Sequence, residues 1–91
     1  MSQPNQLING QWHLGEGSLL TSVNPARNQV IWQGNTASVA QVSSAVLSAR
    51  QAFTSWSQTP IEQRIAIITA FAEQLTLAKE TIAQTIALET G

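Results

Sequence analysis

The sequence has 91 residues, of which 43% are hydrophobic and only 10% charged, with a formal net charge of −1. The length suffices for one small domain, and the four scattered basic residues form no patch that could bind nucleic acid. No run approaches the roughly 20 apolar residues that span a bilayer, and cysteine is absent, which excludes disulfides, thiolate metal sites and a cysteine nucleophile within these residues. We therefore expect neither nucleic acid nor membrane as a partner, and a cytoplasmic location. The sparse charge has two explanations: a preference for neutral polar residues, or a surface that another structure covers.

Residues 1–35 are expected to form strands and turns. Asn9-Gly10 lies between apolar residues, and because this pair tolerates two positive φ angles, it predicts a type I′ hairpin turn. A second extended run, residues 19–23, ends at the turn signal Asn24-Pro25. A third, residues 30–33, is β-branched and aromatic, and Gly34-Asn35 is interpreted as its end.

Residues 36–91 are expected to be helical. Ser38, followed three positions later by Gln41, fits a capping box, with Thr36 as a competing start. Apolar residues then recur at steps of three and four, which places them on one helix face. This first stripe consists of Val39, Val42, Val46, Ala49, Phe53 and Trp56.

A second helix is predicted from residue 60 onward. Thr59 offers a hydroxyl cap, Pro60 suits the first helical position, and Glu62 occupies the capping-box position. Its length is about 17 residues, or about 26 Å at the usual rise per residue. Its stripe consists of Ile61, Ile65, Ile68, Ala72 and Leu75. A further apolar set follows at Ile82 and Ile86, and the weak boundary at residues 76–80 leaves open one long helix or two. The expected fold is thus α+β, with a hairpin and short strands followed by two or three amphipathic helices.

Residue chemistry alone supplies no catalytic group. His13 is the only histidine, and Glu16 is the only acidic residue near it in the sequence, so a local structural role is favoured over general-base or metal chemistry. Gly15-Glu16-Gly17 lacks the third glycine of a dinucleotide-binding fingerprint and is interpreted as a turn. We assign no catalytic or cofactor-binding residue.

Several short segments occur in an order and spacing typical of one enzyme family. They are residues 8–12 (Ile-Asn-Gly-Gln-Trp), Asn24-Pro25, Val30-Ile31, the helix with Ala45, Ala49-Arg50, Ala52-Phe53 and Trp56, the pair Glu62 and Arg64, Phe71-Ala72 with Leu75, and Glu89-Thr90-Gly91. Together they resemble the opening of NAD(P)-dependent aldehyde dehydrogenases, over essentially the whole chain. Residues 32–35 (Trp-Gln-Gly-Asn) are most similar to succinylglutamate semialdehyde dehydrogenases of bacterial arginine catabolism.

The resemblance implies that residues 1–91 form a single N-terminal segment in the nucleotide-binding half of a longer oxidoreductase. That parent would oxidise N-succinylglutamate 5-semialdehyde to N-succinylglutamate with NAD. In the family, the cysteine nucleophile, general-base glutamate, oxyanion-stabilising asparagine and nucleotide-binding segments all follow the matched region, so NAD is not expected to bind this segment alone. The implied partner is the remainder of the aldehyde dehydrogenase chain, and the isolated segment is expected to self-associate through exposed apolar faces. The alternative is a self-contained helical interaction module without enzymatic activity.

The resemblance also suggests a monovalent-cation site. Some family members hold such an ion with backbone oxygens just before the Asn-Pro turn and with the acidic residue of the acidic-Thr-Gly motif. The matching positions are Ser22, Val23 and Glu89. Hard cations prefer oxygen ligands of this kind. The alternative is that Glu89 makes only a local cap or salt bridge.

Overall fold

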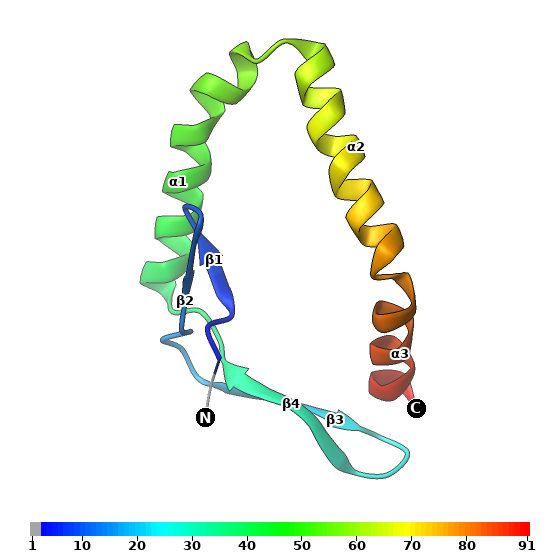
Figure 1. Cartoon of the computed structure of the whole chain (residues 1–91). Coiled ribbons are helices and arrows are strands. Elements are labelled where there is room, and N and C mark those ends of the chain that lie inside the picture. The colour runs from blue at the N-terminus through cyan, green and yellow to red at the C-terminus, as the bar shows by residue number, and fades with distance from the viewer. Residues whose placement is uncertain (1–2) are drawn as a thin grey trace.

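The computed structural model describes residues 3–91 as two antiparallel hairpins followed by three helices (Figure 1). The predicted α+β order is confirmed. The strands lie within residues 6–35 and the helices within residues 39–90. The elements are β1 (Gln6–Ile8), β2 (Gln11–His13), β3 (Leu19–Asn24), β4 (Gln29–Asn35), α1 (Val39–Gln58), α2 (Ile61–Leu77) and α3 (Lys79–Thr90).

The first hairpin has the predicted turn. Asn9 and Gly10 have φ angles of 53° and 74°, as a type I′ turn requires at both central positions. Ile8 pairs with Gln11 across the turn, and Leu7 pairs with Trp12.

The second hairpin is a longer ribbon of β3 and β4, with an irregularity in the pairing between Ser22 and Val23. The Asn24 side chain supports its turn by accepting a hydrogen bond from the Ala26 amide at 3.0 Å. The expectation that β4 ends before Gly34 was wrong. Gly34 and Asn35 continue the strand because they pair with Leu20 and Leu19.

The first helix begins as predicted. The Gln41 amide donates to the Ser38 hydroxyl at 3.1 Å, and the Gln41 side chain accepts from the Ser38 amide at 3.0 Å, which completes the capping box. The competing start, Thr36, instead pairs with Ser18.

The start of α2 differs from the prediction. The Thr59 hydroxyl donates to the Ser55 carbonyl of α1 at 2.9 Å, so it is used by the preceding helix. Pro60 precedes the first helical residue without a side-chain cap, and the predicted box of Thr59 with Glu62 was wrong. The length of 17 residues agrees with the prediction. The open question at residues 76–80 is resolved as two helices, separated at Ala78 (φ −91°, ψ 3°).

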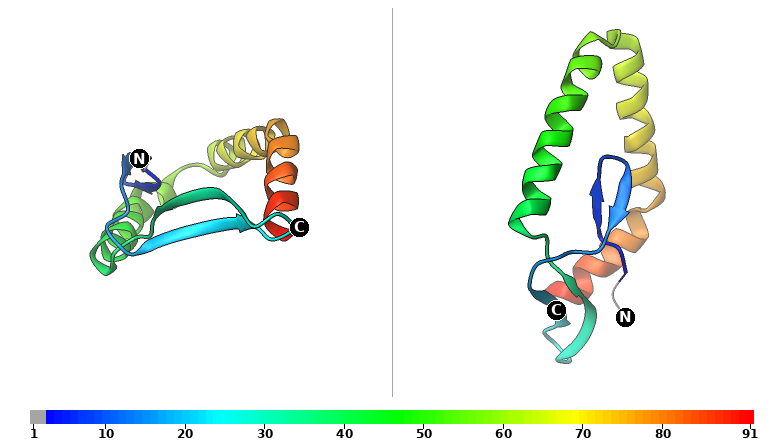
Figure 2. Two further views of the ribbon diagram at one scale, coloured as in Figure 1. Left: turned by 90° about the horizontal axis from the view of Figure 1, so that it is seen from below. Right: turned by 90° about the vertical axis from the view of Figure 1, so that its left-hand side faces the viewer.

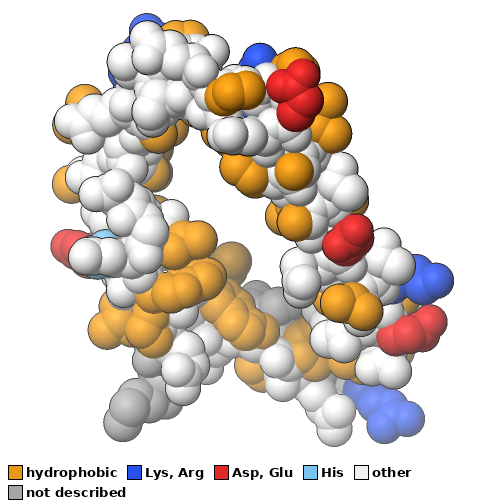
Figure 3. Space-filling model, turned by 45° about the horizontal axis from the view of Figure 1, so that its top comes forward, with side chains coloured by type: hydrophobic (Ala, Val, Ile, Leu, Met, Phe, Trp, Pro, Cys, Tyr) orange, Lys and Arg blue, Asp and Glu red, His pale blue; other side chains and the backbone are white. Residues whose placement is uncertain are grey.

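The elements form an open ring (Figures 1 and 2). Helices α1 and α2 diverge from their connecting turn, and α3 returns to contact β3, so the β3–β4 ribbon closes the base. The radius of gyration is 16.9 Å, against roughly 12 Å for a compact domain of this length. No hydrophobic residue within residues 3–91 is buried, and Figure 3 shows hydrophobic side chains around the central opening. The apolar stripes of the helices therefore stay exposed within residues 3–91.

None of the helices in residues 3–91 is both long and apolar enough to cross a membrane.

Candidate functional site

The structure brings together two of the three residues proposed for the cation site, Ser22 and Glu89. The Ser22 hydroxyl of β3 donates a hydrogen bond to Glu89 Oε2 in the last turn of α3, although the two residues lie 67 positions apart in the sequence. Val23 follows Ser22 directly, at the irregularity of the ribbon. The hydrogen bond of Glu89 is thus a contact between distant residues, which differs from the local cap or salt bridge of the alternative.

A crevice of about 420 Å³ lies beside this contact, between the ribbon and α3. Its lining combines apolar side chains with the hydroxyls of Ser22 and Thr85 and the Glu89 carboxylate. The lining residues are Leu20, Ser22, Ile31, Trp32, Thr85, Leu88 and Glu89. The glycine after α3 fits this packing: Gly91 has φ +78°, and a Cβ there would approach Pro25 to 3.2 Å. The end of α3 is therefore held against both the ribbon and its turn.

The donor set at this place consists of oxygens only. Glu89 has a carboxylate, Ser22 has a hydroxyl and a backbone carbonyl, and Val23 has a backbone carbonyl. Residues 3–91 contain no cluster of three or more histidine, cysteine, aspartate or glutamate side chains. Oxygens of this kind are the ligands that hard cations prefer, whereas transition metals favour nitrogen and sulfur ligands.

A polar joint, formed by Asn5, Gly15, Gly17, Asn35 and Gln41, fixes the start of α1 against both hairpins. The Gln41 carboxamide accepts from the Glu16 amide at 2.9 Å and donates to the Leu14 carbonyl at 2.8 Å. The side chains of Asn5 and Asn35 also bond to backbone groups. Asn5 donates to the Asn35 carbonyl and accepts from the Gly15 amide, and Asn35 donates to the Gly17 carbonyl.

The two glycines of the joint permit a close backbone approach. A Cβ on Gly15 would lie 2.0 Å from the Asn35 carbonyl oxygen, and one on Gly17 would lie 2.7 Å from the Ala37 carbonyl oxygen. The sequence interpretation treated residues 15–17 as a turn and Gln41 only as a cap. The pair Gly15 and Gly17 was the sequence signal for this contact, because glycine allows another group to approach the backbone closely.

His13 is exposed at the end of β2. It borders a small depression of about 180 Å³ together with Ile8, Glu16, Gln41 and Ser44. In the part of the chain that the structure describes, its side chain has no hydrogen-bonded acid to orient it as a general base.

Comparison with known proteins now identifies the family. The protein-family model described as "Aldehyde dehydrogenase family" matches residues 12–91. The chain belongs to the aldehyde dehydrogenase family. Its fold is similar to the crystal structure of an NAD-dependent benzaldehyde dehydrogenase from Corynebacterium glutamicum, with a TM-score of 0.86 and 37% sequence identity. The match covers 93% of this chain and 19% of that one.

These findings confirm the family expected from the sequence. The two hairpins and three helices correspond to the N-terminal part of an aldehyde dehydrogenase. The chain spans about a fifth of the length of the enzyme it matches.

Proposed function

We propose that residues 1–91 are the N-terminal structural portion of an NAD-dependent aldehyde dehydrogenase, with the reaction carried by residues outside this segment. The observation that carries the proposal is the family fold over 93% of the chain combined with the absence of any buried hydrophobic residue in residues 3–91. A segment with this fold and no core of its own is built to pack against something else.

Chemistry places the reaction in the rest of the enzyme and leaves a structural role to this segment. Aldehyde oxidation through an acyl intermediate needs a nucleophile, and these 91 residues contain no cysteine. NAD, when bound to the whole enzyme, supplies the hydride acceptor. The polar joint and the contact between Ser22 and Glu89 hold helices and strands in a fixed relation, which is a scaffold role. The NAD dependence of the benzaldehyde dehydrogenase from C. glutamicum supports the choice of cofactor.

For the substrate we propose N-succinylglutamate 5-semialdehyde, oxidised to N-succinylglutamate in arginine catabolism in the cytoplasm. The support is the similarity of residues 32–35 to the enzymes that carry out this step. The test is a purified parent enzyme assayed for NADH formation with this semialdehyde and with benzaldehyde in parallel. Higher kcat/KM with the semialdehyde supports the proposal, and a preference for benzaldehyde contradicts it.

The proposal of a monovalent cation at Ser22, Val23 and Glu89 is supported by the contact between Ser22 and Glu89. In crystals of the parent enzyme soaked in rubidium, we expect an anomalous peak beside the Glu89 carboxylate, which the Glu89→Gln variant loses. An empty map in the unaltered enzyme contradicts the site.

The alternative, a self-contained helical interaction module, is favoured by no observation. Such a module would bury its helical stripes internally, and within residues 3–91 the stripes are exposed. The isolated chain is expected to produce no NADH from any aldehyde with NAD. Turnover by this chain, with contaminating enzyme excluded, would overturn the scaffold role.

A further inference from the structure

The turn of the first hairpin contains a pair of residues with chemistry of its own. Asparagine is one of the chemically labile residues of proteins, because its side-chain carbonyl carbon lies within reach of the main-chain nitrogen of the next residue. Attack by this nitrogen is easiest when the next residue is glycine, which has no Cβ to obstruct the approach. Asn9 is the only asparagine of the chain that is followed by glycine.

The attacking nitrogen is accessible at this turn. Asn9 and Gly10 are both exposed. In a type I′ turn the hydrogen bond joins the first and fourth residues, here Ile8 and Gln11, so the amide of the third residue takes no part in it. Within residues 3–91 the Gly10 amide donates to no backbone carbonyl. Beyond its chain neighbours, no atom lies within 4 Å of the position that a Cβ on Gly10 would occupy.

The hairpin is also short enough to open. Ring closure needs the Asn9 side chain and the Gly10 nitrogen to rotate toward each other, which a rigid backbone would prevent. The hairpin has three residue pairs, and the residues of both strands are exposed or half-buried. A two-stranded hairpin of this size is marginally stable in water, so we expect its tip to open often.

The other asparagines in residues 3–91 are less suited to this reaction. Those with hydrogen-bonded side chains are Asn5, Asn24 and Asn35. Asn28 is a close counterpart of Asn9, because it is exposed and has the same φ of 53°, but Gln29 follows it. The Cβ of Gln29 obstructs the nitrogen that would attack. Asn28 therefore serves as a control within the same chain.

We propose that Asn9 is a site of spontaneous deamidation, with water as the co-reactant. The Gly10 nitrogen loses its proton to a base in the solvent and attacks Asn9 Cγ. The new C–N bond closes a succinimide ring, while the bond from Cγ to the amide nitrogen breaks and ammonia leaves. Water then adds to one of the two ring carbonyls and breaks its bond to the ring nitrogen. Opening at Cγ gives aspartate, opening at the main-chain carbonyl gives isoaspartate, and neither route transfers electrons.

Isoaspartate would change the end of the hairpin and spare its base. It adds a methylene to the main chain of a two-residue turn, whose geometry depends on the length of the loop. The pairing of Ile8 with Gln11 next to the turn is therefore expected to be lost. The base is held separately, because the Asn5 amide donates to the His13 carbonyl at 3.0 Å. The modification also adds one negative charge at the tip.

Mass spectrometry of peptides from the chain, incubated in native buffer at neutral and mildly alkaline pH, measures deamidation at each asparagine. Electron-transfer fragmentation distinguishes isoaspartate from aspartate. We expect deamidation to be at least about tenfold faster at Asn9 than at Asn28. We also expect it to accelerate with pH, because the attacking nitrogen must lose a proton, and to yield both products. A smaller ratio of rates, or aspartate as the sole product, overturns the proposal.

The variant Gly10→Ala separates attack by the nitrogen from opening of the turn. Its Cβ obstructs the nitrogen, whereas the positive φ at this position strains the turn and favours opening. We expect deamidation of Asn9 to slow at least about tenfold, and a smaller effect refutes the role of glycine. The unaltered chain in concentrated urea gives the rate without protection. The native rate is expected to lie within about tenfold of it, and stronger protection contradicts the accessibility of the turn.

Discussion

Gln41 offers a sharp test of the polar joint. Only 7% of its surface is exposed, and its side chain makes three hydrogen bonds: from the Glu16 amide at 2.9 Å, from the Ser38 amide at 3.0 Å, and to the Leu14 carbonyl at 2.8 Å. The substitution Gln41→Met keeps the length of the side chain and removes all three bonds. Two of these bonds, to Glu16 and Leu14, connect α1 to the segment after the first hairpin, whereas the bond from Ser38 lies within the helix cap. At about 1 kcal/mol net for each connecting bond, opening of the joint becomes easier by about 2 kcal/mol.

The Gly17 amide reports this opening. It donates to the Thr36 carbonyl at 2.7 Å and does not touch Gln41 directly, so its exchange measures the joint as a unit. A change of about 2 kcal/mol corresponds to roughly 30-fold faster hydrogen exchange of this amide, measured by NMR. The control is Gln51→Met, the same substitution at an exposed position of α1, and we expect it to leave the Gly17 rate unchanged. Equal rates in the two variants would refute the view that Gln41 holds the hairpins to α1.

Three further predictions concern backbone and contacts. Gly15→Ala is expected to open the joint as strongly as Gln41→Met, because the new Cβ would lie 2.0 Å from the Asn35 carbonyl oxygen; loss of protection at Gly17 checks this. Gly10→Ala meets no atom within 4 Å, so only its positive φ is strained, and a smaller loss of about 1 kcal/mol is expected in the population of the first hairpin, measured by chemical shifts. Ser22→Ala removes the hydrogen bond to Glu89, and the amides in the last turn of α3 are expected to exchange several-fold faster, with unchanged rates in α2 as the internal control.

Local signals predicted the features that depend on neighbouring residues. The Asn9-Gly10 turn and the cap of Ser38 with Gln41 each involve residues within four positions of one another, and both formed as expected. The cap at Thr59 failed although its signal was also local. A threonine hydroxyl near a helix end can donate to the carbonyl four residues earlier as readily as it can cap the next helix, and here it bonds to Ser55.

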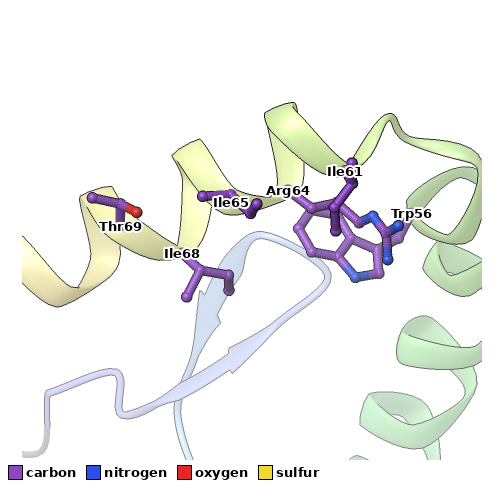
Figure 4. Close-up of a pocket in the computed structure, with 6 residues that line it drawn as sticks. All are labelled: Trp56, Ile61, Arg64, Ile65, Ile68 and Thr69. Atoms are coloured by element: carbon purple, nitrogen blue, oxygen red, sulfur yellow. The ribbon is translucent and has the colours of Figure 1, made fainter.

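Contacts between distant residues could not be found in this way. Nothing near Gly15 in the sequence indicates that Asn35 lies against it, and nothing near Gln41 indicates the Leu14 carbonyl. Periodicity placed Ile61, Ile65 and Ile68 on one helix face (Figure 4), but it gives no information about which other segment packs against that face. The approach of Ser22 to Glu89 was reached from the family resemblance, not from spacing, because 67 positions separate them.

The β3–β4 ribbon sets the width of the opening between the helices. One end of the ribbon leads into α1, and the other lies against the end of α3 (Figure 1). Each residue of a strand advances the chain by about 3.3 Å. Removal of two adjacent cross-strand pairs would therefore shorten the ribbon by about 7 Å, and the side chains would keep their alternation between the two faces. The number of residues in two short strands thus determines how large a body can fit between α1 and α2.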